Sequence, residues 1–114
     1  PDGFPEFSFT TRDGSVKIYE TENRYVEIGV RDQKLFLDVT HAWNVLEAPT
    51  ITEVPVGGGD LDIRVIVDRG SIEIFADGGA ISVTSLIFVE TALSTLEASE
   101  GISGLAIRGL SLRA

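Results

Sequence analysis

Apolar and polar residues alternate along most of the chain, with the period of two that is typical of half-buried strands. Segments such as "SVKIYE", "YVEIGV", "KLFLDVT" and "ISVTSLIF" place every second side chain on one face. Gly, Asp and Asn residues separate these segments at short intervals. Short alternating segments between tight turns predict an all-β fold, either an antiparallel sandwich or a barrel. The segment "ETALSTLEASE" has some helical character, but we expect a loop followed by a strand.

The segment 61–88 reads "LDIRVIVDRGSIEIFADGGAISVTSLIF" and predicts three strands joined by turns at "DRG" and "DGG". The pairs that these turns predict are Val67 with Ile72, Val65 with Ile74, Ile66 with Glu73, Ile74 with Val83, Glu73 with Thr84, and Phe75 with Ser82. Both hairpins then put the same branched residues on one face, namely Val65, Val67, Ile72, Ile74, Ile81 and Val83. Because a slip of one residue would reverse every side chain, this agreement supports the register. We expect this face to be the core.

The opposite face of these strands mixes charged side chains with large apolar ones. The apolar members are Ile66, Phe75, Leu86 and Phe88. A solvated face does not need them, and a patch of this kind usually marks something that covers it. The cover is either another segment of the same domain or a docking partner, for example a neighbouring domain.

Length and composition predict a single domain over residues 1–114. The chain has no cysteine, which excludes disulfides and cysteine-based zinc sites. A net charge of −9 argues against a nucleic acid or an anionic membrane as the partner, whereas a neutral polysaccharide is compatible with it. No apolar run approaches the roughly 20 residues of a membrane-spanning helix. Because the chain begins "PDGFPEF" without Met, we expect it to be cut from a longer precursor.

The residues of the chain give little support for a catalytic function. His41 is the one imidazole, and no G-x-S-x-G motif is present, so nucleophilic catalysis is not expected. Asp68 and Glu73 share the outer face with Arg64, which indicates a cross-strand charge cluster rather than a glycosidase acid pair. Oxygens for Ca²⁺ could come from Asp38, Asp60, Asp62 and Asp77, but their spacing matches no defined calcium loop. We expect no catalytic residue, no metal and no cofactor.

Binding a sugar requires fewer groups than catalysis does, namely an aromatic side chain on which the sugar can stack and a few planar polar groups that form hydrogen bonds. Trp43 is the obvious platform, with Tyr25 as a second aromatic residue upstream. Trp43 equally suits a structural position where a strand leaves the sheet, so its role stays open between these two.

The segment 61–88 resembles the hallmark stretch of the C-terminal β-sandwich domain of glycoside hydrolase family 32. The matching positions are Leu61, Arg64, Val67, Asp68, Ser71, Ile72, Glu73, Ile74, Phe75, Asp77, Gly78, Thr84, Ser85 and Phe88. The segment from "FSFTT" to "LFLDVT" and the final "LEASEGISGLAIRGLSLRA" are also similar to that domain. Gly70 departs from the usual Ser, and Val39-Thr40 from the usual Arg-Ser. The strands that normally precede "FSFTT" are not evident, and a swapped or dimeric arrangement could repair the resulting edge.

The resemblance implies a two-sheet sandwich of the jelly-roll or concanavalin-like kind. Enzymes of this family, the invertases, levanases and inulinases, cleave β-fructofuranosides with a separate five-bladed propeller. No propeller motif occurs in this chain, so the resemblance implies a non-catalytic accessory module of a fructan-active glycosidase, and not an enzyme. It also favours a secreted or extracytoplasmic location. The apolar outer face is then where a propeller would sit.

The role within such an enzyme stays open between structural support and binding of levan or terminal fructose, because related sandwiches form carbohydrate-binding module family 66. If sugar is bound, we expect polar contacts from Asp68, Arg69 and Glu73, with Trp43 or Tyr25 as the stacking face. The alternative is a free-standing domain for protein interaction or dimerisation, with Ile66, Phe75, Leu86 and Phe88 in the interface.

Overall fold

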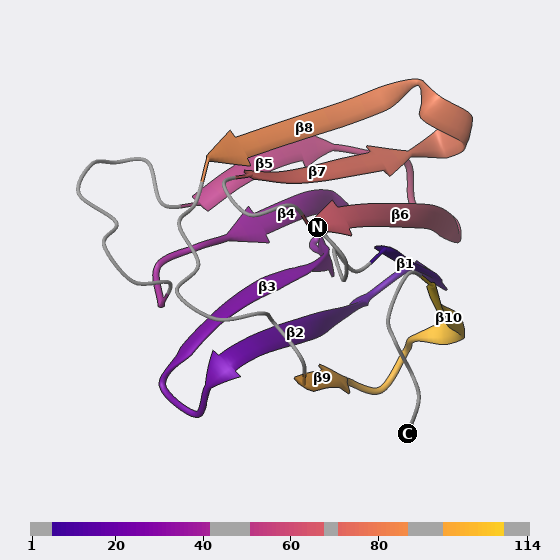
Figure 1. Cartoon of the computed structure of the whole chain (residues 1–114). Helices are drawn as coiled ribbons and strands as arrows, with labels where there is room; N and C mark the ends of the chain where they lie inside the picture. The colour runs from indigo at the N-terminus through magenta and orange to yellow at the C-terminus, as the bar shows by residue number, and fades with distance from the viewer. Residues whose placement is uncertain (1–5, 42–50, 68–70, 87–94, 109–114) are drawn as a thin grey trace.

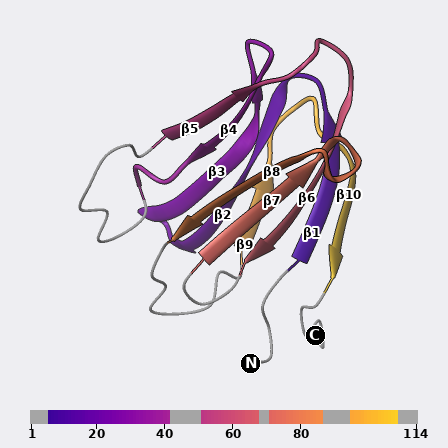
Figure 2. The same cartoon turned by 90° about the horizontal axis from the view of Figure 1, so that it is seen from above.

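The computed structural model describes residues 6–41, 51–67, 71–86 and 95–108, and within them the chain forms two five-stranded sheets packed face to face (Figure 1). Sheet A has the strand order β10-β1-β6-β7-β8, and sheet B has the order β5-β4-β3-β2-β9. The strands are β1 (Glu6–Thr11), β2 (Gly14–Thr21), β3 (Arg24–Arg31), β4 (Lys34–Asp38), β5 (Ile51–Pro55), β6 (Leu61–Val67), β7 (Ser71–Ala76), β8 (Ile81–Leu86), β9 (Thr95–Ala98) and β10 (Ser103–Arg108). Seen from above, the two sheets form separate layers (Figure 2). The antiparallel sandwich is therefore confirmed, and the barrel is not what forms.

The predicted register of the β6–β7–β8 meander is confirmed at every pair that we derived from the turns. Val65 pairs with Ile74 across the first hairpin, and Ile74 pairs with Val83 across the second. The strand expected in "ETALSTLEASE" is β9, which pairs with β2. The short 3₁₀ turn η1 (Asp77–Gly79) joins β7 to β8.

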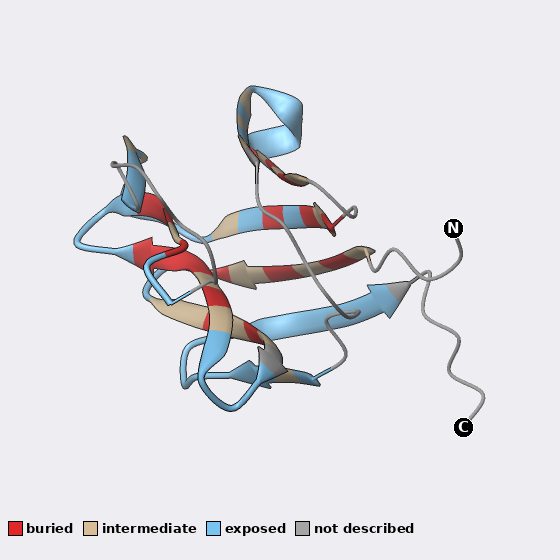
Figure 3. Cartoon of the chain, turned by 60° about the vertical axis from the view of Figure 1, so that its left-hand side comes forward, coloured by how far each residue is buried: buried red, intermediate tan, exposed pale blue. Residues whose placement is uncertain are grey.

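The core lies between the sheets, where alternate residues of both inner faces meet. Figure 3 shows buried residues alternating with more exposed ones along the central strands. The fully buried members include Val16, Val26, Ile28, Leu35, Leu37, Ile63, Val65, Ile72 and Ile74. The Phe7 and Phe9 rings stack 6.1 Å apart at an angle of 14°. Of the predicted core set, Ile81 and Val83 are only half-buried, because β8 is an edge strand and packs against the core from one side.

Two backbone features with glycines at positive φ lie at one end of sheet A. Between the pairs Ser103–Thr10 and Ala106–Ser8, β10 contains one residue more than β1, which is a β-bulge. Gly104 adopts the left-handed conformation there, with φ of +65°. The η1 turn also needs glycine, because φ reaches +98° at Gly79. These features lie beside the site described next.

Candidate functional site

A depression of about 460 Å³ lies on the outer face of sheet A, at the end where β7 enters the η1 turn. We call it the Phe75 depression. Its lining includes side chains from β1, β6 and β7 together with glycines of the turn and the bulge: Ser8, Thr10, Asp62, Arg64, Phe75, Gly78, Gly79 and Gly104. Strand pairing brings these groups together, because Ser8 lies opposite Arg64, and Arg64 lies opposite Phe75.

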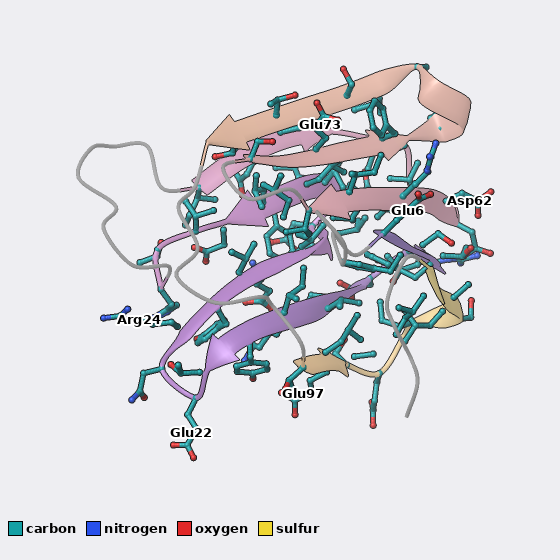
Figure 4. All side chains as sticks on the ribbon, viewed as in Figure 1. Glu6, Glu22, Arg24, Asp62, Glu73 and Glu97 are labelled. Atoms are coloured by element: carbon teal, nitrogen blue, oxygen red, sulfur yellow. The ribbon has the colours of Figure 1, made fainter. Side chains whose placement is uncertain are left out.

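Two hydrogen bonds hold the polar groups of the Phe75 depression in place. The Arg64 Nε donates to Glu6 Oε2 at 2.6 Å, and the Thr10 hydroxyl donates to Asp62 Oδ1 at 2.7 Å. The hydrogen bond and the charge of Glu6 raise the pKa of Arg64. Since the Arg64 side chain is 55% exposed, this pair fixes geometry more than it stabilises the fold. Figure 4 shows Glu6 and Asp62 on the same side of sheet A.

Phe75 supplies the aromatic surface of the depression. Its side chain is half-buried on the outer face, between Arg64 on β6 and Ser82 on β8. The carbon at the centre of the Arg64 guanidinium lies 6.0 Å from the centre of the Phe75 ring. That distance is at the outer limit of a cation–π contact, so the attraction between the guanidinium and the ring is weak.

The outer face of sheet B carries a second aromatic group, which we call the Tyr25 cluster. The Tyr25 ring stacks on His41, with 4.7 Å between their centres, and meets Tyr19 at 5.2 Å. The Lys17 ammonium lies 5.1 Å from the centre of the Tyr25 ring. The Tyr19 hydroxyl donates to Glu97 at 2.7 Å, a bond that raises the pKa of Tyr19 to about 12. A sugar would have to displace one of these neighbours to stack on Tyr25.

The structure does not bring Tyr25 and Glu73 into one site, although both were predicted to contact sugar. Val26 and Ile72, their neighbours in the chain, point into the core, so the two side chains face outward from sheet B and sheet A respectively. Glu73 pairs with Ile66 and Thr84 instead. The remaining predicted sugar contacts, Trp43, Asp68 and Arg69, lie outside the described residues.

The predicted docking patch is described only in part. Ile66 is half-buried on the outer face of sheet A, where it pairs with Glu6 and Glu73. Phe75 belongs to the depression. The backbone of Leu86 pairs with Ser71, while its side chain and the whole of Phe88 lie outside the description. Ile66 and Phe75 are therefore neighbours on one face, as the register predicted.

The sequence did not predict that β1 contributes side chains to the Phe75 depression. Ser8 and Thr10 reach the depression only because β1 inserts between β10 and β6, and Asp62 is held there by Thr10. The alternation in "EFSFTT" shows that Ser8 and Thr10 share a face, but no local signal identifies the strand beside them.

The described residues show no candidate metal site and no candidate membrane span. Within these ranges no group of three His, Asp or Glu side chains gathers where a metal ion could bind. Asp60, one of the aspartates considered for Ca²⁺, pairs with Arg12 at 3.2 Å. No helix in the part of the chain that the structure describes is long and apolar enough to cross a membrane.

These observations define a two-sheet β-sandwich module with the Phe75 depression on the outer face of sheet A and the Tyr25 cluster on the outer face of sheet B. The chain belongs to the family described as glycosyl hydrolases family 32 C terminal, which it matches over residues 5–109. The resemblance carried by the segment 61–88 is thereby confirmed.

Known relatives are longer proteins. The chain is 28% identical over 121 residues to a levanase of Bacillus subtilis, an alignment that covers 98% of the chain and 17% of the levanase. An exo-inulinase from Aspergillus awamori shares the fold with a TM-score of 0.72 at 18% identity, over 93% of this chain and 24% of that one. A sucrose-6-phosphate hydrolase from Lactobacillus gasseri gives a TM-score of 0.74 at 15% identity, over 96% of this chain and 25% of that one. The chain therefore spans at most about a quarter of these relatives.

Proposed function

We propose that the chain is a non-catalytic accessory module of a fructan-active glycosidase, and that it supports the catalytic domain structurally. The observation that carries this proposal is the family match over residues 5–109, together with a levanase relative of which the chain covers 17%. A module of this extent leaves most of such an enzyme to other domains.

The described carboxylates support a non-catalytic role. Hydrolysis of a glycosidic bond uses two carboxyl groups about 5–10 Å apart, one of which must carry a proton to the leaving group. Near the Phe75 depression, Glu6 accepts a hydrogen bond from Arg64, and Asp62 accepts one from Thr10. Both carboxylates therefore act as acceptors in bonds that hold the sheet surface together.

The surface around Ile66 is the proposed contact with the catalytic domain. Ile66 is a half-buried apolar group on an outer face, and the carboxylate of Glu73, opposite it on β7, can pair with a basic group of a partner. Interfaces of this kind inside one protein are small and partly polar. Such a contact would fix the module on the enzyme without taking part in the reaction.

Two measurements test this function. The purified chain should release no fructose from levan, inulin or sucrose, with the B. subtilis levanase as the positive control. The matching segment of that levanase is then replaced by this chain, and the chimera should be more thermostable than the levanase without the segment. Replacing Ile66→Asp in the chimera should remove that gain. Fructose release by the chain alone would reject the non-catalytic role, and an unimproved chimera would reject the structural one.

A protein-interaction or dimerisation domain is the second candidate, and one observation favours it. The edge strand β10 exposes Leu105 (40%) and Ile107 (38%), and an unpaired edge can pair with another chain. Sedimentation velocity at micromolar concentrations decides between the two. A dimer that Ile107→Lys dissociates would favour this candidate, and a monomer throughout would reject it.

A further inference from the structure

We propose that the Phe75 depression binds the ring of a neutral sugar, with Phe75 as the stacking face and Arg64 and Asp62 as hydrogen-bonding groups. The choice of a fructan as its first ligand rests on the proposed function, whereas the site itself rests on the residues that line the depression.

The shape and lining of the Phe75 depression suit a small polyhydroxylated ring. Its volume of about 460 Å³ lies within the roughly 300–1,000 Å³ of small-molecule sites. A sugar ring presents C–H groups on one face and hydroxyls around its edge. The electron-rich face of Phe75 suits the C–H groups, while hydroxyls at the edge can reach the polar groups that surround the ring.

Both hydrogen-bonding groups have capacity beyond the bonds that hold them. A guanidinium has five donors, and the bond from Nε to Glu6 uses one. A carboxylate can accept about four hydrogen bonds, and the Thr10 hydroxyl supplies one to Asp62. Because these bonds already orient Arg64 and Asp62, binding costs less side-chain entropy than at a mobile surface site.

The charge of the site disfavours an anionic ligand. Arg64 contributes one positive charge, and Glu6 and Asp62 contribute two negative ones, within a chain of net charge −9. An anionic ligand, such as a phosphate or an acidic polysaccharide, would meet net repulsion. Neutral sugars pay no such penalty.

Glycines keep one edge of the Phe75 depression open. A Cβ atom added at Gly78 or Gly79 would meet nothing within 4 Å, so the turn leaves room above the sheet. At Gly104 the nearest atom would be the Thr10 hydroxyl oxygen, at 3.8 Å. A ligand can therefore approach the backbone of the turn and the bulge, whose amides become reporters of binding.

The test is an amide ¹H–¹⁵N NMR titration of the chain with fructo-oligosaccharides from levan and from inulin, and with isomalto-oligosaccharides as a glucan comparison. We expect fructan-dependent shifts at the amides of Phe75, Gly78, Gly79 and Gly104. Affinity electrophoresis in levan then compares three variants. Phe75→Leu keeps an apolar group without the aromatic face and should weaken binding about tenfold. Phe75→Tyr keeps the aromatic face and should bind levan as the unaltered chain does. Ile66→Ala, on the same face but outside the depression, should leave binding unchanged.

Each outcome bears on the proposal. Shifts confined to the Tyr25 cluster, or equal loss of binding in Phe75→Leu and Ile66→Ala, would overturn the site while leaving a fructan module standing. Shifts at the four amides with glucan but not fructan would support the site and count against the fructan-active enzyme. No shift with any of the sugars would overturn the site and leave the structural role to its own test. Thermal unfolding of each variant separates lost binding from lost folding.

Discussion

Gly29 is the position in sheet B where the smallest possible substitution is expected to cost the most. It is a buried residue in the middle of β3, and it lies opposite Ser15 on β2 and Phe36 on β4. A Cβ atom built there would lie 2.1 Å from the carbonyl oxygen of Gly14 and 2.6 Å from the Cα of Ser15. Both of these atoms are backbone, so no side chain can rotate away. The change Gly29→Ala must therefore push β2 away from β3.

The size of the effect follows from that distance. Ordinary van der Waals contact begins near 3.4 Å, so the strands must separate locally by more than 1 Å. Forcing one extra carbon into a packed site typically costs about 1–3 kcal/mol, and occasionally more. Because the displaced atoms belong to paired backbone, we expect a loss of about 3 kcal/mol, near the upper end of that range. For a domain of about 100 residues this lowers the melting temperature by roughly 10 °C or more.

Urea denaturation followed by circular dichroism measures the loss, with Gly57→Ala as the matched control. A Cβ atom at Gly57 would meet nothing within 4 Å, and its φ is not in the left-handed region. The same chemical change should there be neutral or stabilising by up to about 1 kcal/mol, because alanine reduces the entropy of the unfolded chain. Equal free energies of unfolding for the two variants would refute the close approach of β2 and β3, provided that the slope of this free energy against urea concentration is unchanged.

Three further predictions concern single groups. Absorbance titration at 295 nm should show Tyr19 ionising near pH 12, because its hydrogen bond to Glu97 raises its pKa. That bond therefore stabilises the fold below pH 10, and the stabilisation is lost as the pH rises through 12. An unchanged ionisation of Tyr19 in the Glu97→Gln variant would contradict this. Ile74→Ala should cost about 2–5 kcal/mol in urea denaturation, because Ile74 is fully buried, and a cost below 1 kcal/mol would place it outside the core. Gly104→Ala should cost about 1 kcal/mol from its positive φ alone, and a larger cost would indicate a clash that the structure lacks.

Local pattern was sufficient to predict the β6–β7–β8 meander residue by residue. The two turns fix the pairings of Val65 with Ile74 and of Ile74 with Val83, because hairpin register depends only on the turn and the alternation beside it. The position of Ile66 and Phe75 on the outer face followed from the same alternation. These are contacts between residues close in the chain, which is why the sequence alone could predict them.

The pairing of strands that are far apart in the chain could not be predicted from local alternation and turns. Strand β1 lies between β6 and β10, so Ser8 meets residues more than fifty positions away. Nothing in "EFSFTT" distinguishes β6 from any other neighbour, and the order of strands depends on the packing of the whole sandwich. The same limit explains why Tyr25 and Glu73 were grouped in one sugar site. Both point outward, but alternation does not tell to which sheet a strand belongs.

The outward residues of β6 and β7 are not explained by the core. Packing between the sheets depends on the inward residues, such as Val65 and Ile74, which are fully buried. Their neighbours Arg64 and Phe75 could be any strand-compatible polar residues without changing that core. Instead they place a guanidinium and an aromatic ring beside a turn whose glycines keep space open above the sheet. The meander therefore builds the sandwich with one face and offers a preorganised surface with the other, which is the arrangement that a binding site on a rigid element requires.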